Sequence, residues 1–231
     1  INSINKPTRT RQNSAVTDLT HLPFITIDPS DAKDHDDAVF VTNDTAERNF
    51  EGFIIWIAIS DVSYFIKEGS FLDKEAYNRG NSTYFLDTVV PMLPSQISSN
   101  ICSLKKNSIR QCIVLKIRID KSGKKIEHSF SRSLIKTIEA LSYEDAQKKF
   151  SEGDACSSKK IKEILTPLWN AFYALEIEKN ARHPLDLELP ELKLTVNDFG
   201  EITSIGIKKR LESHKIIEDL MILANRCAAE T

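Results

Sequence analysis

The chain has no long hydrophobic run and only 4 cysteines in 231 residues. No segment approaches the roughly 20 apolar residues that a membrane-spanning helix requires, and no signal-peptide pattern is present. The cysteines stand at Cys102, Cys112, Cys156 and Cys227, without a C-x-x-C pair. This spacing argues against a zinc site or a disulfide framework and favours buried free thiols in a reducing compartment. We therefore expect a soluble, cytoplasmic protein without membrane association.

Internal repeats, low-complexity tracts and a clear internal boundary are also lacking. With 41% hydrophobic and 28% charged residues, the chain can bury a real core. The basic stretch at residues 6–11 suits a flexible tail. We predict a flexible basic segment at 1–20 and one domain at 21–231. Because the first residue is Ile1 and not methionine, we expect a piece of a longer protein.

The apolar pattern predicts an α+β domain in which strands come first and helices later. Strands are expected at 24–27, 38–42, 53–59, 112–119 and 126–138. A short helix is expected at 70–80, followed by loops with small elements at 81–110. Ser142 can cap a helix that begins after it, and Thr166 and Pro167 can begin another. A shorter helix at 159–165 either precedes that helix or joins it through a kink. A last helix starts near Leu211.

Residues 28–37 carry five carboxylates within ten residues: Asp28, Asp31, Asp34, Asp36 and Asp37. Left unpaired, neighbouring carboxylates repel one another and raise their own pKa values. Mg²⁺ prefers oxygen ligands and turns that repulsion into a binding site. Because strand-like runs lie on both sides, the sequence predicts a metal-binding loop held between two strands.

Other interpretations of this acidic segment stay open. An acidic surface loop is the ordinary form of a charge run, and Asp-Pro and Asp-Asp steps are common in turns. An EF-hand loop requires glycine at its sixth position and glutamate at its twelfth, and neither falls in place when counting starts at Asp28 or Asp34. The pair His35-Asp36 also occurs in metal-dependent phosphohydrolases, but the other histidines form no matching arrangement.

The net charge of −2 hides an uneven distribution. Between residues 105 and 136, ten basic residues stand against two acidic ones. In 113–119 the cations alternate with β-branched residues, so that one face of a strand would carry positive charge and the other would enter the core. Either a solvated sheet face or a field that attracts phosphates fits this pattern.

The order of the acidic residues closely resembles a known catalytic signature. Asp28, Asp34, Asp36 and Asp37 stand at the spacing D-x5-D-x-D-D. This pattern is similar to that of the RNB family of exoribonucleases, the ribonuclease II and ribonuclease R group. Further family-like blocks follow in order: I-A-I-S-D-V-S at 57–63, R-G-N-S-T-Y-F and P-M-L-P within 79–94, L-E-L-P-E at 187–191, and H-K-I-I-E-D-L-M-I-L-A-N at 214–225. The likeness spans nearly the whole chain and is nearer to ribonuclease R than to ribonuclease II.

The resemblance implies a mixed, largely antiparallel sheet with helices packed around it. It also implies a magnesium-dependent 3′→5′ hydrolytic exoribonuclease that acts processively on single-stranded RNA and releases nucleoside 5′-monophosphates. By this resemblance Asp28, Asp34 and Asp37 are ligands of Mg²⁺, for which Mn²⁺ could substitute. Asp36 would be catalytic, by positioning a second metal, the attacking water or the terminal hydroxyl. No nucleotide cofactor is expected.

Two RNA contacts are implied in the same way. Tyr84 falls at the tyrosine that packs on the terminal nucleotides, since flat bases stack on aromatic rings without a sequence preference. Arg110 falls at a position that contacts phosphate. Many members carry phenylalanine where this chain has Leu187, so that a stacking contact there would be weaker.

Family members also contain blocks that this chain does not. They continue with an arginine-rich T-S-P-x-R-R-Y block that completes the active site, and they carry small oligonucleotide-binding barrels on both sides. We therefore expect a C-terminally incomplete catalytic domain, in which missing cationic side chains would weaken transition-state stabilisation. Whether this piece alone degrades RNA is an open hypothesis. The alternative is a non-catalytic remnant that binds RNA or a protein partner.

Overall fold

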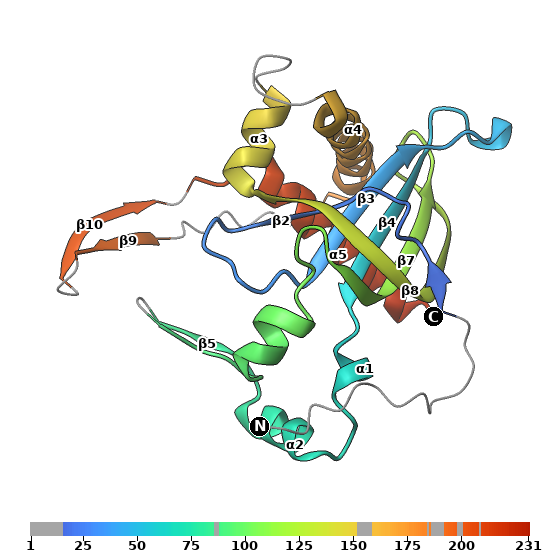
Figure 1. The fold of residues 1–231 in the computed structure, drawn as a ribbon. Helices are drawn as coiled ribbons and strands as arrows, with labels where there is room; N and C mark the ends of the chain where they lie inside the picture. Colours follow the sequence, from blue (N-terminus) through green and yellow to red (C-terminus); the bar gives the residue numbers. More distant parts are fainter. Residues whose placement is uncertain are drawn as a thin grey trace.

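The computed structural model describes residues 16–85, 88–151, 159–183, 185, 192–197, 201–207 and 209–231. At the centre of this part of the chain lies a curved sheet in the order β1-β8-β2-β3-β4-β7 (Figure 1). The strands are β1 (Thr17–Asp18), β2 (Phe24–Asp28), β3 (Asp37–Asn43), β4 (Phe53–Ser60), β7 (Ile109–Ile119) and β8 (Lys125–Ser142). Strands β2, β3, β4 and β7 pair antiparallel in succession, whereas β8 runs parallel to β1 and β2. The predicted mixed, largely antiparallel sheet is confirmed.

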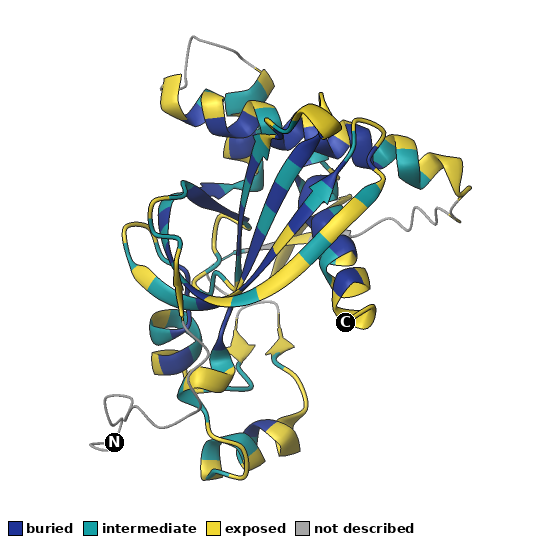
Figure 2. Cartoon of the chain, turned by 90° about the vertical axis from the view of Figure 1, so that its right-hand side faces the viewer, coloured by how far each residue is buried: buried dark blue, intermediate teal, exposed yellow. Residues whose placement is uncertain are grey.

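Strand β8 reaches both ends of this sheet. Residues 125–136 pair antiparallel with β7, and residues 137–142 pair parallel with β2. The sheet therefore closes on itself through β8, which curves across the molecule in Figure 2. The strand runs beyond its predicted end at residue 138 because β2, over 100 residues earlier in the chain, supplies hydrogen-bond partners up to Ser142.

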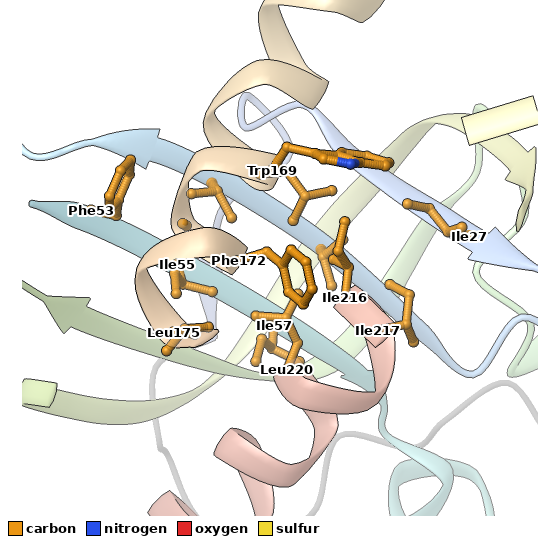
Figure 3. Packing of buried hydrophobic residues seen from close by; sticks show 14 of the residues in the cluster. Ile27, Phe53, Ile55, Ile57, Trp169, Phe172, Leu175, Ile216, Ile217 and Leu220 are labelled. Atoms are coloured by element: carbon orange, nitrogen blue, oxygen red, sulfur yellow. The ribbon is translucent and has the colours of Figure 1, made fainter. Parts of the chain in front are cut away.

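Three helices cover one face of the sheet: α3 (Tyr143–Ser151), α4 (Lys159–Ala181) and α5 (Glu212–Ala229) (Figure 1). Figure 3 shows Ile55 and Ile57 of β4 packed against Trp169 and Phe172 of α4 and Ile216 of α5. A smaller buried cluster, which includes Phe24, Ala38, Leu104, Val114 and Ile135, forms a second core. The larger core fixes the strands that carry the acidic loop.

Helix α4 is one continuous helix, so the helix expected at 159–165 does join the following one, and only the predicted helix start at Thr166 and Pro167 is wrong. The Thr166 hydroxyl donates to the carbonyl of Lys162, 2.9 Å away, as a residue inside a helix does. Pro167 removes one backbone donor. The helix continues through it because Ile164, Leu165 and Leu168 are buried on one stripe across the proline. The Ser142 cap, by contrast, is confirmed, since its Oγ accepts from the Asp145 amide at 2.9 Å.

A long excursion separates β4 from β7. It contains α1 (Val62–Phe65), α2 (Phe71–Arg79), the β5–β6 hairpin (Thr83–Tyr84 and Val89–Val90) and a π-helical turn at Ile97–Ile101. The helix predicted at 70–80 and the small elements after it are confirmed. A 3₁₀ turn (Glu47–Asn49) lies between β3 and β4, and a second hairpin, β9 (Leu192–Val196) with β10 (Ile202–Ile207), precedes α5.

The turn before β8 contacts α4 closely. Gly123 has a φ of +81°, in the left-handed region that favours glycine. A Cβ at this position would lie 2.2 Å from the carbonyl oxygen of Ala174 in α4. The glycine is therefore required both by the turn and by its contact with the helix.

Other predictions concern the ends and the cysteines. Residues 1–15 lie outside the described residues, so their predicted flexibility is untested, while Thr17 and Asp18 pair with β8 and so belong to the sheet. Cys102, Cys112 and Cys227 are buried free thiols as predicted, and Cys156 lies outside the described residues. No helix of the described residues is long and apolar enough to cross a membrane.

Candidate functional site

The acidic loop leaves the sheet at the end of β2 and returns at the start of β3. Asp28 is the last residue of β2, and Asp37 is the first of β3, where it pairs with Ile59. The loop is held from outside: the Ser60 amide donates to the Asp36 carbonyl at 3.0 Å, and the Leu104 amide donates to the His35 carbonyl at 2.9 Å. The predicted strand–loop–strand arrangement is confirmed.

The four motif carboxylates influence one another electrostatically. Burial raises the pKa of Asp37 to about 7, and the charges of Asp28 and Asp36 contribute. Loss of solvation, together with the charges of Asp34 and Asp28, also raises the pKa of Asp36, which nevertheless remains exposed to solvent. Burial is the largest cause of both shifts, and repulsion between neighbouring carboxylates adds to it. A cation bound among them would relieve that repulsion.

His35 lies within this cluster. Its Nδ1 is 2.7 Å from Oδ2 of Asp28, and the two side chains are only 18% and 13% exposed. The hydrogen bond to Asp28 raises the pKa of His35, although burial opposes the shift. His35 therefore supplies positive charge beside Asp28 when it is protonated.

The structure adds Tyr143 to the neighbourhood of the cluster. Asp28 pairs with Ser142 in the parallel β2–β8 ladder, so that Tyr143 follows beside it. Burial raises the pKa of Tyr143 to about 12, with contributions from Asp28 and Asp37. Its ring stacks on His214 with centroids 4.0 Å apart. Sequence reasoning missed this residue because its proximity depends on pairing between strands far apart in the chain.

The carboxylates do not form a closed cage in this structure. Among the residues that the structure describes, no three histidine, cysteine or acidic side chains converge as a ready metal site. Asp28 and Asp37 are held by strands and Asp36 by the bond at its carbonyl, while Asp31 is exposed. The donor set nevertheless fits magnesium chemically, because it consists of hard carboxylate oxygens.

The two predicted RNA contacts occupy different environments. Tyr84 lies in β5 and is 69% exposed, so its ring is free to stack on a base. Arg110 lies in β7, and its guanidinium donates to three carbonyls: Ser103 at 3.0 Å, Ile109 at 3.0 Å and Asn100 at 3.1 Å. These bonds give Arg110 a structural role, and its phosphate contact stays a prediction. Leu187 lies outside the described residues.

Several of the basic side chains between residues 105 and 136 form ion pairs or ring contacts within the fold. Arg118 pairs with Asp44 and Glu127, and Lys106 pairs with Glu139 at 2.6 Å. Lys116 lies over the ring of Trp56 with Nζ 5.6 Å from the centroid. Lys106 and Lys116 lie on a solvated face of the sheet, as one of the two interpretations expected, whereas the Arg118 side chain is only 15% exposed.

Asp61 also has a structural environment. It is 1% exposed, its Oδ1 accepts from the Ser63 hydroxyl at 2.6 Å, and its Oδ2 lies 3.3 Å from Nε of Arg132. The Arg132 guanidinium balances the charge of the carboxylate, although Oδ2 accepts no hydrogen bond. Asp61 therefore supports the start of the excursion after β4.

A family model described as the RNB domain matches residues 16–231. Together with the acidic loop at the end of β2, this match shows that the chain belongs to the RNB family. The resemblance inferred from the motifs is confirmed.

The relatives are ribonucleases R. The chain is 37% identical to "Ribonuclease R" of Thermotoga maritima over 97% of its own length and 32% of that protein. It is 38% identical to the Vibrio parahaemolyticus protein of the same name over 92% of the chain and 25% of that protein. A solved structure of Mycoplasma genitalium RNase R in complex with ribose methylated single-stranded RNA matches with a TM-score of 0.85 and 27% identity, over 92% of this chain and 32% of that one. The chain thus spans a quarter to a third of these proteins.

Proposed function

We propose that the chain carries the metal-binding and catalytic part of a magnesium-dependent 3′→5′ exoribonuclease. Its substrate would be single-stranded RNA, degraded processively to nucleoside 5′-monophosphates. The observation that carries the proposal is the position of four motif carboxylates between β2 and β3, with raised pKa values at Asp36 and Asp37. Membership of the RNB family and the RNA bound in the Mycoplasma genitalium relative support it.

Asp28, Asp34 and Asp37 would hold the metal. A bound magnesium ion, or manganese in its place, supplies positive charge to the scissile phosphate and activates a water molecule. The strand ends hold Asp28 and Asp37, and these two residues would fix the site relative to the sheet. His35 holds Oδ2 of Asp28 at 2.7 Å and would thereby orient that carboxylate.

Asp36 is our candidate for the catalytic group. Its carboxylate is exposed, and its backbone carbonyl is fixed by the Ser60 amide at 3.0 Å. A carboxylate so placed can orient the attacking water or the terminal hydroxyl of the RNA. Tyr84 would stack on a base near the 3′ end, and the two N–H groups of Arg110 not used on carbonyls would remain for a phosphate.

A second candidate function is non-catalytic binding of RNA or of a protein partner. One observation favours it: among the described residues no three potential ligands converge as a ready metal site. In that case the carboxylates would stay too far apart to bind one metal ion together. RNA would then bind without being hydrolysed.

The two functions differ in their products. Purified chain would be incubated with 5′-labelled single-stranded RNA, with magnesium or with chelator, beside Asp36→Asn and Asp31→Asn as the matched control. The proposal predicts a ladder that shortens from the 3′ end only with magnesium, an Asp36→Asn rate lower by at least about 100-fold, and an unchanged Asp31→Asn rate. Intact RNA with the wild-type chain, beside an active full-length relative, would contradict catalysis by this piece.

A further inference from the structure

A buried segment distant in sequence contacts the acidic loop. We define it as the 102–104 segment. The Ser103 hydroxyl accepts from the His35 amide at 3.1 Å and donates to the Lys33 carbonyl at 3.2 Å. The Leu104 amide donates to the His35 carbonyl at 2.9 Å. Ser103 and Leu104 have no exposed surface.

The 102–104 segment is itself anchored on the sheet. Arg110 in β7 donates from Nε to the Ser103 carbonyl at 3.0 Å. Ser60 at the end of β4 donates its hydroxyl to the Cys102 carbonyl at 2.6 Å, while its amide donates to the carbonyl of Asp36. Hydrogen bonds from β4 and β7 therefore hold the 102–104 segment, which in turn holds the acidic loop.

The loop has little internal support. Within 29–36, all of which the structure describes, the backbone hydrogen bond inside the loop runs from the Ala32 amide to the Pro29 carbonyl. The other hydrogen bonds that hold the backbone of Lys33, His35 and Asp36 come from Ser103, Leu104 and Ser60, outside the loop.

We propose that Ser103 is a positioning residue for the metal-binding loop. Its hydroxyl fixes the backbone on both sides of Asp34, at Lys33 and at His35, and so sets the direction in which the neighbouring carboxylates project. Arg110 supports it by holding the Ser103 carbonyl. The catalytic consequence rests on the proposed function, whereas the anchoring of the loop does not.

Hydrogen exchange tests the anchoring without metal or RNA. Backbone amide exchange at His35 would be measured for the wild-type chain, Ser103→Ala and Ser133→Ala. Ser133 is equally buried, but its hydroxyl contacts Ser131 in the strand region away from the loop. We expect exchange at His35 to be about tenfold faster in Ser103→Ala and unchanged in Ser133→Ala. Unchanged exchange in Ser103→Ala, with the fold intact, would overturn the proposal.

A second variant covers the case in which Ser103→Ala does not fold. Arg110 is partly exposed, and Arg110→Lys retains the charge while a single ammonium cannot hold the Ser103 and Asn100 carbonyls together. Exchange at His35 should again accelerate, by a smaller factor. An exchange rate at His35 equal to that of the wild-type chain would contradict the claim that Arg110 in β7 supports the loop through Ser103.

The consequence for function has its own readout. If the chain degrades RNA, Ser103→Ala should raise the magnesium concentration needed for half-maximal rate by about tenfold, with the KM for RNA unchanged. A purely structural role would lower the thermal midpoint without moving the magnesium requirement, and that result would refute positioning. A wild-type chain without activity would refute the proposed function alone, because the exchange result would stand.

Discussion

The sheet with its three helices and the excursion between β4 and β7 differ in how they bury apolar side chains. The sheet, α4 and α5 enclose the larger core, and Trp169 within it has no exposed surface. The excursion presents aromatic side chains to solvent: Phe71, Tyr77, Tyr84 and Phe85 are 59% to 87% exposed. Figure 2 shows this change from buried residues in the sheet and helices to exposed ones around α2.

This difference indicates that the packed sheet and helices hold the acidic loop, whereas the excursion offers exposed aromatic rings for contact. The acidic loop leaves from strands of the packed body, so its ends are held as firmly as the core itself. The exposed rings add little to folding, because they are not removed from water. They are available to stack on a flat ligand such as a nucleic acid base, a contact that does not depend on base sequence.

The largest effect is expected for a substitution in the packed body. Trp169 stacks on Phe150, and its indole nitrogen donates to Glu212 at 3.2 Å. Trp169→Ala should lower the free energy of unfolding by ~3–5 kcal/mol, whereas Phe71→Ala in the excursion should change it by less than about 0.5 kcal/mol. Denaturant unfolding measures both values. Similar losses in the two variants would remove the distinction between body and excursion.

A smaller effect is expected when an exposed ring is removed. Tyr84→Ala should weaken binding of single-stranded RNA by ~1–3 kcal/mol without changing the thermal midpoint. Tyr77 is 87% exposed and provides the matched control. Fluorescence anisotropy with labelled RNA measures the affinities. Equal losses for Tyr84→Ala and Tyr77→Ala would indicate a general aromatic surface in place of a stacking site.

A third effect concerns the dependence of stability on pH. The pKa of Asp37 is raised from 3.8 to about 7 in the folded chain, so the folded state binds more protons than the unfolded state between these values. The raised pKa values of Asp36 and His35 act in the same direction. In chelator, stability should therefore fall as pH rises from about 4 to about 7.

The Asp37→Asn variant isolates this contribution. It should reduce the decline in the thermal midpoint over that pH range, while Asp31→Asn should leave it unchanged because the Asp31 side chain is exposed to solvent. If Asp37→Asn and the wild-type chain show the same decline, the buried carboxyl group of Asp37 is not the source of the pH dependence.

Local patterns predicted the elements whose causes are local. The acidic loop between two apolar strands, the cap at Ser142 and the helix at α2 follow from neighbouring residues. The family resemblance rested on motif order, which is also readable from the chain. Those features could be predicted without coordinates.

Contacts between distant segments could not be predicted in this way. The extension of β8 depends on β2, the continuity of α4 through Pro167 depends on the sheet beneath it, and Tyr143 reaches the cluster through the β2–β8 pairing. Arg110 shows the same limit: its residue type suits phosphate, but the fold brings the carbonyls of Ser103 and Asn100 to its guanidinium, which leaves only part of its donors for a ligand.

The most direct test of the account is metal binding by the chain itself. Manganese, followed by electron paramagnetic resonance, would be titrated into the wild-type chain and into the variant with both Asp34→Asn and Asp37→Asn, with magnesium as competitor. The account predicts saturable binding to the wild-type chain, displaced by magnesium and lost in the double variant. Equal manganese binding by the two proteins would contradict a metal site in the β2–β3 loop.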